Sequence, residues 1–149
     1  MAATIDAAEA DLNCLFPEAG NQRSFCYPCY QSYVGAGTQR QSYVPLVTER
    51  FIVGRGGGER PNNPALIDLA YTWSWALEGH SAEQMIAYIE QAVSQGHWAI
   101  LCMHGVGAEH IAVSTEALAT TIDFLNRERR RIWTDTVVRI GAYIHRQRQ

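Results

Sequence analysis

The chain has 149 residues, enough for one buried core, and we expect residues 1–149 to form a single domain. Its 47% hydrophobic and 18% charged residues are typical of a soluble globular protein and exclude a disordered chain. The net charge of −3 favours no nucleic-acid partner, and no apolar run approaches the about 20 residues that span a bilayer. We therefore expect neither nucleic acid nor membrane as a partner.

The start of the chain carries acidic side chains and lacks the basic stretch of a secretory signal, which predicts a cytoplasmic location. Four cysteines are too few for a disulfide scaffold and are expected to be thiols in that compartment. Apolar periodicity predicts a helix over 5–16, ended by Pro17. Nothing caps the start of this helix, so we expect the chain to begin inside an element of a larger fold.

The middle of the chain alternates short apolar segments, glycine-rich loops and helices. The expected elements are a strand over 24–27, a helix over 42–51 capped by Ser42, a strand over 51–53, a loop over 54–64, and a helix over 82–94. Residues 65–76 are ambiguous between a helical turn and an extended segment over 71–75. Ser81 and Gln84 form a capping box before the helix, and Gly96 ends it.

The last third repeats helices and strands in alternation. The expected elements are a strand over 98–103, a helix over 115–129 capped by Ser114, a strand over 131–135 and a helix over 136–146. In the helix over 115–129, we expect Leu118, Ile122 and Leu125 to point inward. This alternation predicts parallel strands joined by crossover helices.

The apolar run over 98–103 breaks at once into His104 and Gly105, with Gly107 and His110 close behind. Glycines allow a tight loop, and α/β sheets place their chemistry at the carboxyl ends of buried strands. His104 is therefore a candidate catalytic residue. The alternative interpretation is a hydrogen-bonded histidine at the end of a strand.

Cys26 and Cys29 form a C-x-x-C motif. It indicates a redox dithiol, half of a zinc site with His104 and His110 as conceivable further ligands, or two half-buried thiols without a chemical role. A redox dithiol expects a helix that begins at the first cysteine, whereas this motif ends a predicted strand. That position counts against the redox interpretation.

Aromatic residues gather just before the predicted capping box. Tyr71, Trp73 and Trp75 alternate along a segment that suits a strand. They form either an aromatic platform for a sugar ring or part of an aromatic core.

Several segments together resemble the polysaccharide deacetylase family, the NodB homology domain, in their order and spacing. They include Phe25-Cys-Tyr-Pro-Cys29, Ser42-Tyr-Val-Pro, the helix over 81–93, Trp98 to His110, and Arg131-Ile-Trp-Thr-Asp135. The resemblance implies an α/β fold, a partial (β/α) barrel of about half to two-thirds of the full barrel. It also implies a hydrolase that removes acetyl groups from glycans or acetylated small molecules with a divalent metal, most often zinc.

The resemblance assigns roles to particular residues. The family's Leu-x-His motif corresponds to Cys102-Met103-His104 and implies that His104 is the general acid. Its Arg-x-Pro-Tyr motif falls on Cys26-Tyr27-Pro28-Cys29, where only the proline is kept. We expect the substrate to contact the following residues: Tyr27, Pro28, Cys29, Tyr30, Trp73 and Trp75.

The family's Thr-Phe-Asp-Asp-Gly segment and His-x-x-x-His pair, which supply the catalytic base and metal ligands, do not occur in this sequence. We therefore expect the C-terminal part of a barrel, either with a metal held by His104, His110, Cys26 and Cys29 or with none. Three functions stay open: a deacetylase-like hydrolase, a non-catalytic self-associating or glycan-binding module, and a Cys/His metal or redox site. Because half a barrel exposes strand edges and apolar surface, we expect a homo-oligomer.

Overall fold

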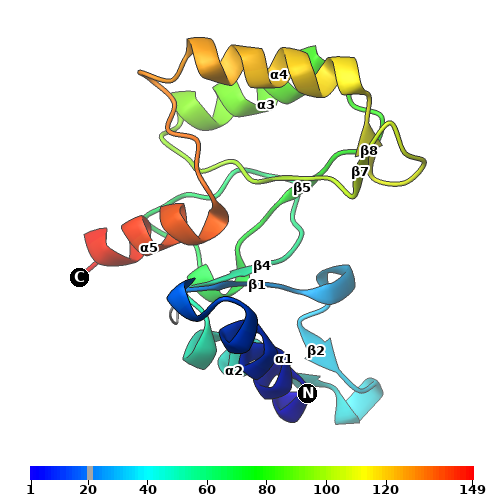
Figure 1. The fold of residues 1–149 in the computed structure, drawn as a ribbon, viewed down its shortest axis with the longest axis vertical. Helices are drawn as coiled ribbons and strands as arrows, with labels where there is room; N and C mark the ends of the chain where they lie inside the picture. The colour runs from blue at the N-terminus through cyan, green and yellow to red at the C-terminus, as the bar shows by residue number, and fades with distance from the viewer. Residues whose placement is uncertain (20–21) are drawn as a thin grey trace. The chain divides into compact units, whose positions relative to one another are not determined.

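A computed structural model describes residues 1–19 and 22–149 of this mixed helix-and-strand protein (Figure 1). The chain divides into two compact units. The first contains Met1–Gly56, Asp68–Thr72 and Val137–Gln149, and the second contains Gly57–Ile67 and Trp73–Thr136. Among the described residues, no helix is both long enough and apolar enough to cross a membrane.

The first unit contains a parallel strand pair, although parallel pairing was predicted only for the chain after residue 82. Strand β1 (Ser24–Cys26) lies beside β4 (Val53–Arg55), with Phe25 opposite Gly54. The Thr72 amide extends the pairing by donating to the Gly54 carbonyl at 2.7 Å. Strands β2 (Tyr33–Val34) and β3 (Gln41–Ser42) form an antiparallel pair. Strand β4 begins later than expected and includes Gly54 and Arg55, which were assigned to a loop.

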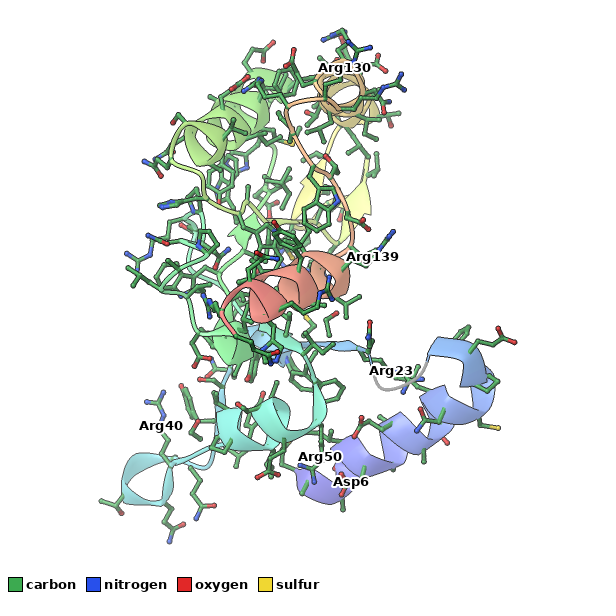
Figure 2. All side chains as sticks on the ribbon, turned by 90° about the vertical axis from the view of Figure 1, so that its left-hand side faces the viewer. Asp6, Arg23, Arg40, Arg50, Arg130 and Arg139 are labelled. Carbon is green, nitrogen blue, oxygen red and sulfur yellow. The ribbon has the colours of Figure 1, made fainter. Side chains whose placement is uncertain are left out.

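The helices of the first unit lie near their predicted positions. They are α1 (Ala2–Leu15), α2 (Val44–Arg50) and α5 (Val137–Gln147), with 3-10 turns η1 (Pro17–Ala19), η2 (Pro28–Tyr30), η3 (Gly37–Gln39) and η4 (Leu69–Tyr71). Helix α1 buries Ile5 and is tied to α2 by Arg50, whose Nε lies 2.8 Å from Asp6 Oδ1 (Figure 2). Tyr43, rather than Ser42, is the N-cap of α2, although Ser42 Oγ accepts from the Val44 amide at 3.3 Å.

The core of the first unit is aromatic. Tyr27 and Tyr43 are buried with Val47, and the ring of Tyr27 lies 5.0 Å from that of Tyr71. Each tyrosine hydroxyl donates to a backbone carbonyl: Tyr27 to Ala70 at 2.7 Å, Tyr71 to Tyr30 at 2.8 Å, and Tyr43 to Gln31. These bonds fix segments that are distant in sequence, because an aromatic hydroxyl taken out of water needs a partner.

Helix α5 packs closely on β4. The contact is at Gly141, where an added Cβ would lie 1.9 Å from Cγ2 of the fully buried Val53. A glycine inside a helix is less favourable than alanine by about 1 kcal/mol. Glycine occupies position 141 because the helix and the strand lie too close together for a larger residue.

The second unit contains a crossover connection, but not between the predicted strands over 98–103 and 131–135. Strands β5 (Trp75–Ala76) and β6 (Leu101–Cys102) pair in parallel and are joined by helix α3 (Ala82–Ser94). Its capping box is present: the Gln84 amide donates to Ser81 Oγ and the Ser81 amide to Gln84 Oε1. Gly96 ends the helix with φ +64°, as predicted. Strands β7 (Gly105–Val106) and β8 (Ala112–Val113) form a second parallel pair before helix α4 (Thr115–Arg127).

Helices α3 and α4 lie side by side and cover an aliphatic core (Figure 1). Leu77, Met85 and Val113 are its most deeply buried members. Ile122, expected to point inward, is 47% exposed, while the neighbouring Thr121 is buried and donates its hydroxyl to the Ala117 carbonyl at 2.8 Å. That bond satisfies a polar side chain inside the core. Consecutive residues of a helix point in different directions, and with Thr121 buried, Ile122 lies on the exposed side.

The predicted strand over 131–135 is wrong. The amides of Arg131 and Ile132 both donate to the Glu128 carbonyl at 2.8 Å, which continues the turn that ends α4. The guanidinium of Arg131 also pairs with Glu90 at 2.6 Å and Glu128 at 3.0 Å. Among residues 1–19 and 22–149, the strands form four two-stranded sheets, none of them closed. The partial barrel and the single domain stay predictions.

Candidate functional site

The candidate site lies where two parallel strands of the second unit end. Ala76 of β5 is opposite Cys102 of β6, and Glu78 and His104 each follow two residues later. Because parallel strands end at the same edge, this register brings a carboxylate and an imidazole to one edge, where α/β proteins place their ligands.

Two hydrogen bonds to Ile111 hold these two residues in place. The His104 amide donates to the Ile111 carbonyl at 2.7 Å, and the Ile111 amide donates to Glu78 Oε2 at 2.6 Å. Ile111 has φ +43°, a left-handed conformation that costs a β-branched residue about 1–3 kcal/mol. Gly107 takes φ +67° in the same loop, where glycine has no such penalty. The carboxylate of Glu78 therefore supports a strained turn.

The side chains of two histidines lie near each other at this turn. The rings of His104 and His110 have centroids 5.7 Å apart, and His110 Nδ1 lies 3.7 Å from Glu78 Oε2. The His110 side chain is 78% exposed and that of Glu78 57%. Water and a substrate can reach all three side chains. Imidazoles exchange protons near neutral pH, and a carboxylate beside one nitrogen orients the ring, so the cluster suits acid–base chemistry.

The fit to a metal ion is poor. Among the described residues, no group of three or more His, Cys, Asp or Glu side chains could hold a metal ion. Catalytic zinc sites need three protein ligands in tetrahedral geometry. These residues do not supply such a set, and we assign no step to a metal.

The C-x-x-C motif lies in the first unit. Cys26 and Cys29 are free and exposed, so the expectation of half-buried thiols is wrong. Cys26 is the last residue of β1 and its sulfur accepts from the Arg55 guanidinium. Tyr27 is extended and Cys29 has φ +49°. No helix begins at the first cysteine, which removes the helix dipole that a redox dithiol uses.

The residues expected to bind substrate divide between the two units. Tyr27 is 1% exposed and belongs to the aromatic core, and its contact with a substrate stays a prediction. Burial, with a smaller contribution from Tyr43, raises the pKa of Tyr27 well above its usual range. Pro28 and Cys29 are exposed, and Tyr30 is half-buried with φ +58°.

Trp73 and Trp75 both pack against other side chains of the second unit. The guanidinium carbon of Arg60 lies 3.7 Å from the centroid of the Trp73 ring. The ring of Trp75 lies 4.4 Å from that of His80 and 4.6 Å from that of Tyr88. These contacts favour packing over an open platform for a sugar ring.

From the sequence we assign no role to Glu78, and we interpret His80 as a surface residue. His80 Nδ1 accepts from the Glu78 amide at 2.9 Å, which fixes the turn after β5. The signal was present, since Glu78-Gly-His80 follows a short apolar segment in the same way as His104-Gly105 follows the next one. The sequence alone does not show that the two segments end at the same edge, because that depends on the register of β5 and β6.

The first unit contains a cavity of about 880 Å³ lined by α1, the end of α2, η4 and α5. Its charges are largely paired: Arg50 bonds to Asp6 at 2.8 Å and to Glu49 at 3.0 Å. The hydrogen bond to Asp6 raises the pKa of Arg50 further. Paired surface charges of this kind indicate packing of α1 on α2.

No protein-family model, curated protein or solved structure matches this chain.

Proposed function

We propose that this chain is a polysaccharide deacetylase-like hydrolase that removes acetyl groups from glycans, with His104 as its general acid. The supporting observation is the exposed cluster of His104, His110 and Glu78 at the shared edge of β5 and β6. The resemblance over residues 25–137 supplies the substrate class. The cytoplasm is part of the proposal, since the four cysteines are not in disulfides and a reducing compartment keeps cysteines as thiols.

Each of the two imidazoles carries out one proton transfer of the reaction. Water attacks the acetyl carbonyl carbon and gives its proton to a base, and the bond to the sugar oxygen or nitrogen then breaks as that atom takes a proton. His110, with Glu78 beside its Nδ1, is oriented to act as the base, and His104 donates to the leaving group. Acetate and the free sugar hydroxyl or amine are the products.

The test is His104→Gln, assayed for acetate release from an acetylated glycan and from a small acetyl ester. Loss of a general acid lowers kcat by about 10²–10⁴-fold. His97→Gln is the matched control, because His97 precedes β6 in the same unit. Activity of His104→Gln equal to that of the unmutated chain, or no acetate release by the unmutated chain, overturns the proposal.

A non-catalytic, self-associating or glycan-binding module is the second candidate. It is favoured by large apolar side chains left in solvent, among them Leu15 at 69% and Trp133 at 51% exposed. Binding of an acetylated glycan without acetate release, followed by tryptophan fluorescence, distinguishes this module from the hydrolase.

The third candidate, a Cys/His metal or redox site, has less support. Among the described residues, no cluster has three suitable metal ligands. Stoichiometric zinc that is lost in Cys29→Ser would restore this candidate.

A further inference from the structure

The turn that follows β5 is held by three successive backbone amides, and each has its acceptor in a different part of the second unit. Two of them donate to backbone carbonyls at 2.9 Å: Leu77 to Cys102 of β6, and Gly79 to Ala112 of β8. The amide between them, that of Glu78, donates to Nδ1 of the His80 ring at 2.9 Å. Of the three acceptors, only the imidazole can take up a proton in the physiological pH range.

This hydrogen bond requires one protonation state of the His80 ring. A backbone N–H only donates, so Nδ1 carries no proton and the ring is the neutral tautomer with its proton on Nε2. The ring is half-buried, and its centroid lies 4.4 Å from that of Trp75. A protonated imidazole carries a hydrogen on both nitrogens and cannot accept from the Glu78 amide. Uptake of one proton by His80 therefore breaks the middle bond of the turn and leaves the two flanking bonds intact.

The residue that loses this bond supports the candidate site. Oε2 of Glu78 accepts from the Ile111 amide at 2.6 Å and lies 3.7 Å from His110 Nδ1. Ile111 has φ +43°, a conformation that a β-branched residue keeps only where its surroundings hold it. Once the backbone of Glu78 is free to turn, its carboxylate holds Ile111 and His110 less firmly.

Two titratable groups of α3, the helix that begins just after His80, keep one charge state near neutral pH. Burial raises the pKa of Tyr88 to about 12. A hydrogen bond from the N-cap side chain lowers the pKa of Glu83. Imidazoles titrate between about pH 5 and 8, so a test of His80 has to separate its proton uptake from that of the site histidines, His104 and His110.

We propose that His80 is a positioning residue of the candidate site, which holds Glu78 against the strained turn at Ile111 while its ring is neutral and releases it on taking up a proton. The bond needs an unprotonated Nδ1, so it is present above the pH at which the ring titrates and is lost below it. The site is therefore ordered at neutral to alkaline pH and loosened in acid. Its effect on catalysis rests on the proposed hydrolase, whereas the change in hydrogen bonding does not.

The first measurement is nitrogen NMR of the His80 ring, together with solvent exchange of the Glu78 and Ile111 amides, between about pH 8 and 5. At the alkaline end the ring should carry its proton on Nε2. The protection factors of both amides, which correct for the intrinsic pH dependence of exchange, should fall by about 2–10-fold as the ring takes up its second proton, the effect of one lost hydrogen bond. A proton on Nδ1 at the alkaline end, a ring that stays neutral throughout, or unchanged protection while the ring titrates overturns the proposal.

Two substitutions at position 80 separate the acceptor from its charge. His80→Asn places an amide oxygen where Nδ1 lies and does not titrate, so protection of the Ile111 amide should stay high across the pH range. His80→Leu has no acceptor, so protection should be about 2–10-fold lower across the same range. His97→Asn is the matched control, since His97 lies in the same unit outside this turn, and it should behave like the unmutated chain. A pH-dependent fall in His80→Asn equal to that of the unmutated chain assigns the effect to His104 or His110 and overturns the proposal.

Acetate release gives a separate readout of the positioning role. Between about pH 8 and 5, kcat of the unmutated chain should fall more steeply than kcat of His80→Asn, because only the unmutated chain releases Glu78. Parallel pH profiles in the two active chains overturn the positioning role. Absence of acetate release from both chains overturns the proposed hydrolase instead, and the NMR result then decides whether His80 controls the turn.

Discussion

The two units bury different kinds of core. The first packs Tyr27, Tyr43 and Tyr71 together and gives each hydroxyl a backbone carbonyl from another segment. The second packs aliphatic residues beneath α3 and α4, and its buried Tyr88 hydroxyl has no hydrogen-bond partner among the described residues. In the first unit, the hydrogen bonds of the tyrosine hydroxyls fix which distant segments lie together. In the second unit, the spacing of apolar residues along the helices determines which side chains form the core.

The largest loss of stability is expected from a substitution in the aliphatic core of the second unit. Met85 is fully buried in the second unit, and Met85→Ala should lower the free energy of unfolding by about 2–5 kcal/mol through lost burial and a new cavity. Chemical denaturation measures the change. Gln91→Ala, an exposed position on α3, should stay within about 0.5 kcal/mol. A loss below about 1 kcal/mol for Met85→Ala would show a core that collapses around the missing side chain.

The second largest loss of stability is expected at the contact of α5 with β4. Gly141→Ala places a methyl group against Val53 and is expected to lower the free energy of unfolding by about 1–3 kcal/mol, despite the better helix propensity of alanine. Adding Val53→Ala removes the clash, so thermal or chemical unfolding of the double variant should show partial rescue. Additive losses in the double variant would contradict this account.

Removing single hydroxyls compares the two cores directly. Tyr27→Phe removes the bond to the Ala70 carbonyl and should cost about 1–2 kcal/mol of stability. Tyr88→Phe removes a buried hydroxyl that has no partner, so the protein should keep its stability or gain about 1 kcal/mol. Equal losses in the two variants, measured by the same urea titration, would show that both hydroxyls are bonded in solution.

The smallest effect is a difference in alkaline stability. Burial raises the pKa of Tyr88 from 10.0 to about 12, and burial also raises the pKa of Tyr43. Because the folded state favours the neutral phenol, this stabilisation is present below about pH 10 and is lost as the pH rises through the folded pKa. Stability of the unmutated chain should therefore fall between about pH 10 and 12, and less steeply in Tyr88→Phe. Identical alkaline profiles would exclude a role for Tyr88.

Local signals were the most predictable part of the fold. The capping box at Ser81, the cap at Ser114 and the left-handed Gly96 depend on a few neighbouring residues, and all are present. The segment over 131–135 was not predictable in the same way. Its apolar pattern suits a strand, but Glu128 and Glu90 bind Arg131 and extend the end of α4.

The candidate site was predictable only in part. His104 follows from a rule about the ends of parallel strands, and the structure places it beside His110. Glu78 depends on the register of β5 and β6, which no local pattern contains. The burial of Tyr27 was not predictable, because a residue at a strand end points either to solvent or to the core, and its hydroxyl donates to the Ala70 carbonyl, 43 residues away.

The interleaving of the two units has a consequence for the order in which they mature on the ribosome. The second unit has all its residues once Thr136 is made, whereas the first still lacks α5. Until Gly141 is made, the helix that contacts Val53 Cγ2 at this position is absent. Within residues 1–149, the first unit therefore gains its last helix only after the second unit has all its residues.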